Sequence, residues 1–345
     1  METKVKSVKG CHRLLDVRVT AEELSVEFDK VYADMSKVAH IPGFRKGKAP
    51  RDLIVCRYRK EAEEEVIKRA IPEYWSKVAQ EENLHPVVMP QVEDVQFKDD
   101  MLYFSVSVDV RPEVKLQDYK KLKVAKKIIN ITDKMVEDTL EKLRHAQTEG
   151  AKDKHESAEE KPLPELNDAF AQRLGLNDMT ALRDTLKKSL QEEAETNRKA
   201  DMEQQIMEQL LRKASLDLPQ PLVEKQAEEV FNRLKFNRIL HGEKKEDVAA
   251  QEAQLKKEAQ KAAQRQVSLS FILDEIARKE NIEVNKEDID GRIQAIAQQT
   301  QKTAEEISRY LEQKNLLSEI EAEIRNNKTM EFLLKEADVE EKEEK

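Results

Sequence analysis

Cationic side chains are concentrated near the N-terminus, in and after the segment IPGFRKGKAP at residues 41–50, which also contains a phenylalanine, Phe44. Residues 42–60 contain one acid, Asp52, and seven cations, although the whole chain has a formal net charge of −9. The cations are Arg45, Lys46, Lys48, Arg51, Arg57, Arg59 and Lys60. Arginine and lysine bind carboxylates or phosphates, and an exposed Phe44 would add apolar contact area. This pattern predicts docking on an acidic or polyanionic surface; a solvated turn between helices is the alternative.

The backbone of the same segment is built for a stiff loop. Gly43 and Gly47 permit the turns that a tight loop needs, because glycine tolerates positive φ. Pro42 and Pro50 restrict the chain before binding, so that less conformational entropy is lost on docking. Pro50 also stands where the first turn of a following helix accepts a proline.

Other residues that could do chemistry do not form a recognisable site in the sequence. The six histidines, at positions 12, 40, 85, 145, 155 and 241, are scattered and make no HxxxH or HExxH pair. The chain has no Walker loop, no GxGxxG and no GxSxG. The two cysteines, Cys11 and Cys56, form no CxxC motif, which fits a reducing cytoplasm. We therefore predict no metal site, no cofactor and no catalytic residue.

Composition favours long helices with solvated faces. Charged residues make up 38% of the 345 residues and hydrophobic residues 39%, while aromatic residues contribute only 5%. A negative net charge disfavours a protein that coats nucleic acid. The N-terminus has no apolar signal core, and no window approaches the ~18–20 apolar residues of a membrane span. We expect a cytoplasmic protein without a membrane partner.

The elements that must position the basic loop are expected to form a small α+β domain. Residues 11–20 alternate apolar and polar side chains as a strand does, and Thr20 with Glu23 has the spacing of a helix capping box. The next helix is expected to bury Phe28, Val31, Met35 and Val38. One or two helices kinked at Pro72 should follow the loop, and two strands should flank residues 98–100.

The remainder of the chain is predicted to be mainly helical. Residues 113–131 look extended, a helix runs from Thr132 to about residue 147, and residues 148–164 form a charged linker. Helices follow from residue 165, with Pro219 and Pro221 starting one and Asn285 and Thr303 capping others. We predict domains at 1–112 and at 113–147 with 165–337, and a charged tail at 338–345 whose EEKEEK end is frayed.

The segment GFRKGKAP at residues 43–50 resembles the GFRxGKxP signature of the trigger factor family of bacterial ribosome-associated chaperones. Residues 163–176 and 216–234 also resemble the family's C-terminal region, so the similarity covers nearly the whole chain. The resemblance implies an α+β ribosome-binding domain followed by an elongated, all-α, SurA-like chaperone domain with arms around a cradle. It implies that Phe44, Arg45 and Lys46 contact the ribosome, while Gly43, Gly47, Lys48 and Pro50 shape and flank the loop.

The implied function is ATP-independent holding of nascent polypeptides at the exit tunnel of the large ribosomal subunit, on a ribosomal protein and adjoining rRNA. A homodimer is left open. Family members usually carry an inserted peptidyl-prolyl isomerase domain of on the order of a hundred residues. This chain has only the linker at that position, and residues 120–169 contain no aromatic side chain. We therefore expect no isomerase activity.

Three alternatives to this function remain at this point. A helical adaptor without client binding explains the helices and the charge but not GFRKGKAP. A peptidyl-prolyl isomerase is the enzyme that the resemblance brings with it. An exported SurA-like chaperone has a similar helical part, but the N-terminus does not look like a signal peptide.

Overall fold

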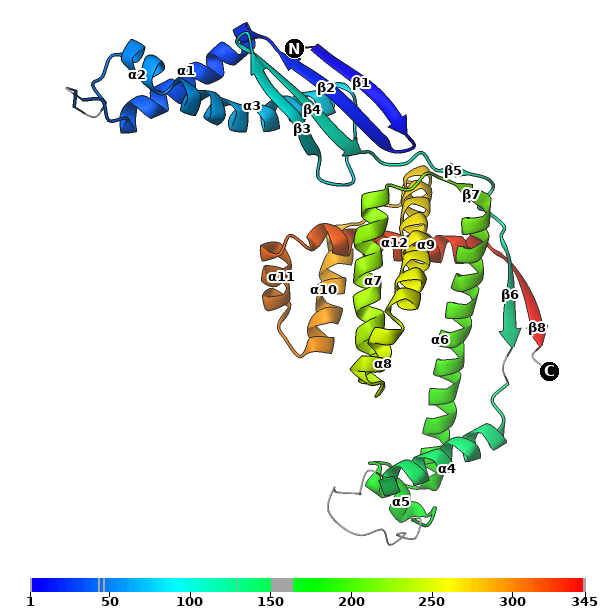
Figure 1. The fold of residues 1–345 in the computed structure, drawn as a ribbon. Coiled ribbons are helices and arrows are strands. Elements are labelled where there is room, and N and C mark those ends of the chain that lie inside the picture. Colours follow the sequence, from blue (N-terminus) through cyan, green and yellow to red (C-terminus); the bar gives the residue numbers. More distant parts are fainter. Residues whose placement is uncertain (1, 43, 46, 129, 150–163, 344–345) are drawn as a thin grey trace. The chain divides into compact units, whose positions relative to one another are not determined.

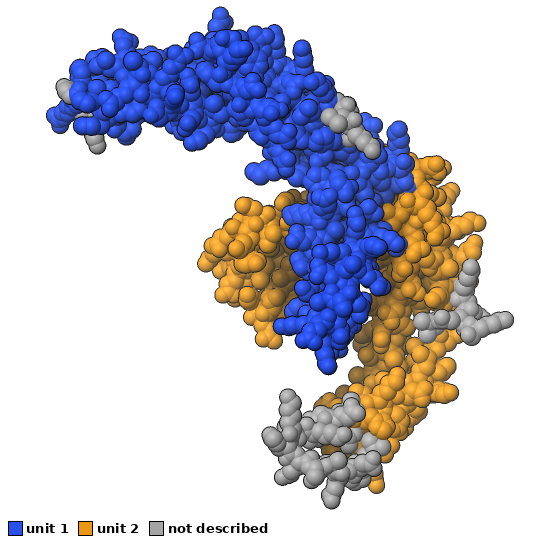
Figure 2. Space-filling view, viewed as in Figure 1, with its two compact units in different colours: residues 1–115, 214–272 blue, residues 116–213, 273–345 orange. Residues whose placement is uncertain are grey.

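The computed structural model describes residues 2–42, 44–45, 47–128, 130–149 and 164–343. By their contacts the residues group into two compact units, coloured separately in Figure 2: residues 1–115 with 214–272, and residues 116–213 with 273–345. This grouping places residues 214–272 with the N-terminal residues. The predicted domain limits stay predictions.

The first unit begins with a four-stranded antiparallel sheet of strand order β1-β2-β4-β3 (Figure 1). Its strands are β1 (Glu2–Lys9), β2 (His12–Val19), β3 (Gln91–Lys98) and β4 (Met101–Asp109). Alternate residues of β2 and β4 are buried, as the sequence predicted. Asp99 and Asp100 both have positive φ, of 53° and 58°, which is the conformation of a tight type I′ hairpin turn.

Three helices lie between β2 and β3 in the chain: α1 (Ala21–Val38), α2 (Arg51–Arg57) and α3 (Arg59–Glu81). Thr20 and Glu23 form the predicted capping box at the start of α1. The prediction for Val38 is wrong: this side chain is 72% exposed, because α1 ends there, and Leu24 completes the buried stripe instead. Two helices follow the loop, and the break between them is at Tyr58. Pro72, where a kink was predicted, lies inside α3, which is one continuous helix.

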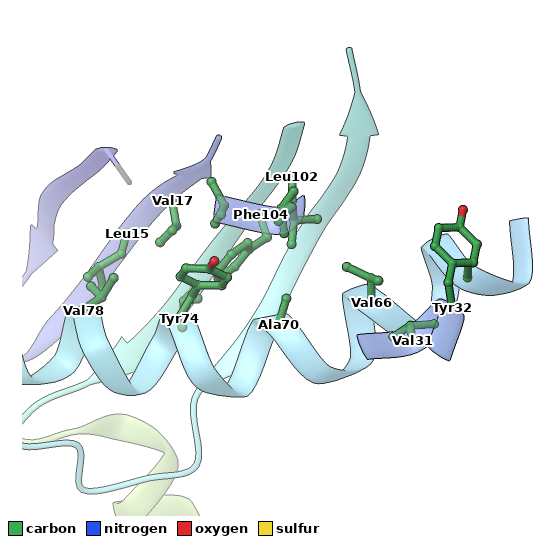
Figure 3. Close-up of a cluster of buried hydrophobic side chains, with 14 of the residues drawn as sticks. Leu15, Val17, Val31, Tyr32, Val66, Ala70, Tyr74, Val78, Leu102 and Phe104 are labelled. Atoms are coloured by element: carbon green, nitrogen blue, oxygen red, sulfur yellow. The ribbon is translucent and has the colours of Figure 1, made fainter. Parts of the chain in front are cut away.

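The main core of this region lies between α1, α3 and one face of the sheet. Figure 3 shows Ala70, Tyr74 and Val78 of α3 directed toward the strand side chains. Leu15 and Phe104 are 0% and 2% exposed in the same cluster. Fully burying a side chain of this size contributes about 1.5–3 kcal/mol. These contacts fix the ends of α1 and α3 and thereby the loop that follows α1.

The first unit also contains α7 (Gln220–Leu240), α8 (Lys245–Ala250) and most of α9 (Glu252–Lys279). Pro219 is the N-cap of α7, with Pro221 in its first turn, as predicted. Val223 on α7 packs with Ala263 and Val267 on α9, and all three are nearly fully buried. A short pairing of β5 (Lys115–Leu116) with β7 (Ala214–Ser215) precedes α7.

The second unit is built mainly of helices. They are α4 (Asp133–Glu149), α5 (Asp168–Arg173), α6 (Met179–Lys213), α10 (Lys286–Thr300), α11 (Ala304–Gln313) and α12 (Leu317–Glu336). Asn285 and Thr303 cap α10 and α11 with capping boxes, which confirms both predictions. Most of the predicted linker at 148–164 lies outside the described residues.

The C-terminal tail differs from the prediction. Residues Asp338–Glu343 form strand β8, which pairs in parallel with β6 (Lys123–Ile128). Most of the EEKEEK segment is therefore strand, because the exposed edge of β6 supplies partners that the tail's own sequence does not reveal. Gly, Pro and large apolar residues are absent from this segment, so no local pattern signals the pairing.

The predicted fold class is confirmed: a mixed N-terminal region with a sheet and helices is followed by a long helical part. Within the described residues, every helix is too short or too polar to cross a membrane.

Tyr119 provides a test of packing in the second unit. Its hydroxyl donates to Glu280 Oε1 at 2.6 Å, and Lys120 Nζ donates to Glu280 Oε2 at 3.0 Å. Burial and the bond to Glu280 raise the pKa of Tyr119 to about 12. Because the folded pKa exceeds the unfolded value near 10, this stabilisation is complete below pH 10 and disappears as the pH rises through 12.

We expect Tyr119→Phe to remove the tyrosinate that titrates near pH 12 in an ultraviolet difference titration. The variant should lose about 1 kcal/mol of unfolding free energy at neutral pH, since one hydrogen bond is deleted. The difference from the parent should shrink between pH 10 and 12. A Tyr119 titration near pH 10 in the parent would contradict the assignment.

Candidate functional site

The basic loop between α1 and α2 is held at both ends by the core. Ile41 is 7% exposed and Ala49 packs against the same core cluster. The Tyr58 hydroxyl donates to the His40 carbonyl at 3.2 Å. Between these ends the chain turns twice, with Phe44 N–H donating to Ile41 O at 3.1 Å and Lys48 N–H to Arg45 O at 3.0 Å. The loop is therefore anchored at its base and directs its central side chains outward.

Glycine is required at one described position of the loop. Gly47 has a φ of +76°, which side-chain-bearing residues rarely adopt. A Cβ at this position would meet no atom within 4 Å, so the requirement comes from the backbone and not from crowding. Gly43 and Lys46, the other predicted site residues in this stretch, lie outside the described residues. Pro50 is the N-cap of α2 and ends the loop.

Three apolar side chains on and beside the loop are exposed. Phe44 is 41% exposed, Leu53 on α2 is 43% exposed, and Val38 at the end of α1 is 72% exposed. The sequence identified Phe44, but it missed Leu53 and misplaced Val38 in the core. In the structure, Leu53 lies beside the buried Ile54 on α2, which has only seven residues and buries one narrow face.

Most of the described cations around the loop form no ion pair within the chain and can therefore bind a partner. Arg51 pairs with Asp29, while Arg59 pairs with Glu63 at 3.0 Å and with Asp100 at 3.1 Å. The hydrogen bond with Glu63 is the main reason that the pKa of Arg59 is raised. In the described part of the chain, Arg45, Lys48, Arg57 and Lys60 are exposed and make no ion pair within 4.0 Å. Exposed apolar and unpaired cationic groups thus occur together.

A second polar group lies on the sheet face opposite the core. His12 Nδ1 is 3.3 Å from Asp109 Oδ1, and His12 Nε2 is 3.4 Å from Ser107 Oγ. The order Ser–His–Asp resembles a catalytic triad, and no sequence motif indicated it because His12 is 95 and 97 positions from Ser107 and Asp109. Both distances exceed the ~2.6–3.2 Å of a working nucleophile and base. Ser107 lies in the middle of β4, which pairs with β2 on one side and β3 on the other, so the main-chain N–H groups around it are hydrogen-bonded within the sheet.

Ser107, His12 and Asp109 form a polar network across strands β2 and β4. His12 and Asp109 are directly opposite each other in the β2–β4 register, where paired polar side chains stabilise a sheet. Within the described residues there is no group of three or more His, Cys, Asp or Glu that could hold a metal ion. The basic loop is the stronger candidate for a functional site.

Comparison with known proteins assigns the chain to a family. The family model for the bacterial trigger factor protein matches residues 1–143, and the model for the trigger factor C-terminus matches residues 178–335. The trigger factor of Geobacter sp. (strain M21) is 26% identical, covering 98% of each chain. That of Geotalea daltonii is 25% identical, covering 100% of this chain and 99% of its relative.

The length of the first alignment shows a difference from these relatives. It spans 428 positions although this chain has 345 residues, so at least 83 positions stand opposite gaps in this chain. The two family models leave residues 144–177 unmatched.

A solved structure shares the fold. It belongs to work on "Promiscuous Substrate Recognition in Folding and Assembly Activities of the Trigger Factor Chaperone". It covers 97% of this chain and is itself covered completely, with 20% identity and a TM-score of 0.59. Both family models, the near full-length relatives and this fold agree, and the chain belongs to the trigger factor family of ribosome-associated chaperones.

Proposed function

We propose that this chain docks at the polypeptide exit tunnel of the large ribosomal subunit through the loop between α1 and α2. The observation that carries the proposal is the exposed Phe44 beside the unpaired Arg45 and Lys48. An aromatic side chain with arginine is a common anchor of protein interfaces, and lysine adds attraction to rRNA phosphates. Lys46 completes the contact set by its place in the family motif.

We further propose that the helical part holds nascent or unfolded polypeptides without ATP. Large apolar side chains are exposed on separate helices: Phe236 at 64% and Leu240 at 70% on α7, and Tyr310 at 55% on α11. Such dispersed groups favour weak contacts at several points, which release a client spontaneously. Docking then raises the local concentration of the chaperone near emerging chains.

In domain terms, residues 1–112 would dock, and residues 113–147 with 165–337 would bind clients as one discontinuous domain. The protein would act in the cytoplasm, where ribosomes and new chains meet. The helical adaptor remains the second candidate. Its distinguishing property is that it would dock without suppressing client aggregation.

The docking proposal is tested by Phe44→Ala/Arg45→Ala/Lys46→Ala. Loss of one anchor residue typically costs ~2 kcal/mol or more, so we expect at least about 30-fold weaker co-sedimentation with large ribosomal subunits. The matched control is Arg233→Ala/Lys235→Ala/Phe236→Ala, which changes the same residue types at exposed positions of α7. Equal sedimentation of the loop variant and the parent would refute docking through this loop.

The holding proposal is tested with the full chain and a chemically unfolded, aggregation-prone protein, monitored by light scattering without nucleotide. We expect suppression at micromolar chaperone, unchanged by the loop substitutions. Phe236→Ala/Leu240→Ala should weaken suppression only a few-fold, because dispersed contacts share the binding energy. If the parent chain suppressed nothing, the adaptor would become the better description.

The isomerase alternative is tested with a protease-coupled prolyl-peptide assay. The gap of at least 83 positions in the alignment and the lack of aromatic residues at 120–169 support a chain without the family's isomerase domain. Prolyl isomerisation has a barrier of ~18–20 kcal/mol, which a charged linker does not lower. We expect the uncatalysed rate. Turnover that persists through repurification would overturn this expectation.

A further inference from the structure

Strand β6 is held along one edge by side chains of α6. Gln205 Oε1 accepts from Ala125 N–H at 2.8 Å, and Gln205 Nε2 donates to Ala125 O at 2.9 Å. Gln209 Nε2 donates to Lys123 O at 2.8 Å. The N–H and C=O of alternate strand residues point to the same side, so the main-chain groups of Val124 and Lys126 face the opposite edge. Val124 is 1% exposed and anchors the strand in the unit.

The opposite edge of β6 is occupied by the chain's own tail, β8. In Figure 1, β8 lies beside β6. Asp338 N–H donates to Leu122 O at 2.9 Å, and the parallel register places Val339 opposite Val124 and Glu341 opposite Lys126. Residues 338–341 of β8 are all exposed, including Val339 at 39%. The tail therefore buries little apolar surface, and its attachment depends on main-chain hydrogen bonds and charge. An isolated two-stranded sheet of this kind is marginally stable in water.

The charges of the two strands are complementary. β6 carries three lysines and no acid, and the register places Lys123 opposite Asp338 and Lys126 opposite Glu341. The third, Lys127, is opposite Lys342 of the tail and pairs with Asp201 on α6 at 3.4 Å, so the complementary charges are those of Lys123 and Lys126. Lys126 Nζ lies 2.9 Å from Glu341 Oε1. This bond lowers the pKa of Glu341, and the nearby Arg198 on α6 adds to the effect. Lys123 and Lys126 are therefore the side chains of β6 that face acids of the tail, and the rest of the pairing is main chain.

We propose that the edge of β6 is a strand-addition site for extended acidic segments of client polypeptides, and that the C-terminal tail occupies it in their absence. This inference rests on the proposed client holding and names one class of client segment. Strand addition obtains its affinity from main-chain bonds that any extended segment can make. The lysines of β6 then favour segments rich in Asp and Glu over basic ones.

The tail acts as a built-in competitor. Only Ala337 separates the end of α12 at Glu336 from β8, so the tail stays beside its site and has an effective concentration of ~1 mM. If a free peptide of the tail sequence binds the vacant edge with a Kd of ~100 μM, the attached tail reduces its apparent affinity about tenfold. Clients would displace the tail only when concentrated, as near a docking site.

The test measures fluorescence anisotropy of a labelled peptide, ADVEEKEEK, which is the sequence of residues 337–345. We expect at least tenfold tighter binding to a chain that ends at Ala337 than to the full chain. A peptide with every charge inverted, AKVKKEKKE, should bind at least tenfold more weakly, and added salt should reduce the difference. Equal binding of the two peptides, or equal binding to both chains, would overturn the proposal.

Point variants locate the site and guard against misfolding of the shortened chain. In the full chain, Glu340→Pro removes an N–H that points the same way as that of Asp338, so it should release the tail and strengthen peptide binding. In the shortened chain, Lys126→Glu should weaken ADVEEKEEK about tenfold and improve binding of the inverted peptide. Lys188→Glu, a 78% exposed lysine on α6, is the matched control and should change neither. Failure of Lys126→Glu to shift either peptide would place binding elsewhere.

The same variants separate this proposal from client holding in general. If the full chain suppresses aggregation while neither peptide responds to Lys126→Glu, holding stands and the β6 site fails. If ADVEEKEEK binds as expected but aggregation is not suppressed, the strand site stands and the holding function fails.

Discussion

The packing of α1 and α3 on one face of the sheet is the constraint on which the candidate site depends. Leu15, Phe104 and Val31 are almost fully buried in this cluster, and Ile41 at the base of the loop belongs to it. Since the two loop ends are fixed by buried contacts, the turns at Phe44 and Lys48 present their side chains on a defined support. A loop organised before binding loses less entropy when it meets a partner.

The loop also shows why a chain of net charge −9 can carry a basic candidate site. Two acids near the loop are engaged with other cations: Asp29 with Arg51, and Glu63 with Arg59. Arg45 and Lys48 at the tip are thereby left without ion pairs in the described structure. Local pairing, and not overall composition, decides which cations are available to a partner.

The periodic spacing of apolar residues in the sequence predicted the helices and strands whose burial follows a regular pattern, but it missed elements without such a pattern. The alternation in β2 and β4 and the caps at Thr20, Asn285 and Thr303 are local signals, and the structure confirms them. Strand β1 was missed because it is an edge strand in which lysines replace an apolar alternation. Val38 was misplaced because helical spacing continues to the last turn, whereas the core beneath it does not. Strand β8 depends on a partner more than two hundred residues away.

Both surfaces proposed to bind partners offer lysine or arginine on an otherwise acidic chain. The screening length is about 8 Å at physiological ionic strength, so the remaining negative charge acts weakly beyond the nearest groups. At contact distance the partner meets the tip cations of the loop or the lysines of β6, and each can bind an anion despite the net charge. Because the net charge is screened, short-range geometry and the nearby cations decide whether an anionic partner binds. An acidic chain can therefore present small basic surfaces that are able to bind an anionic partner, which is what the docking proposal requires.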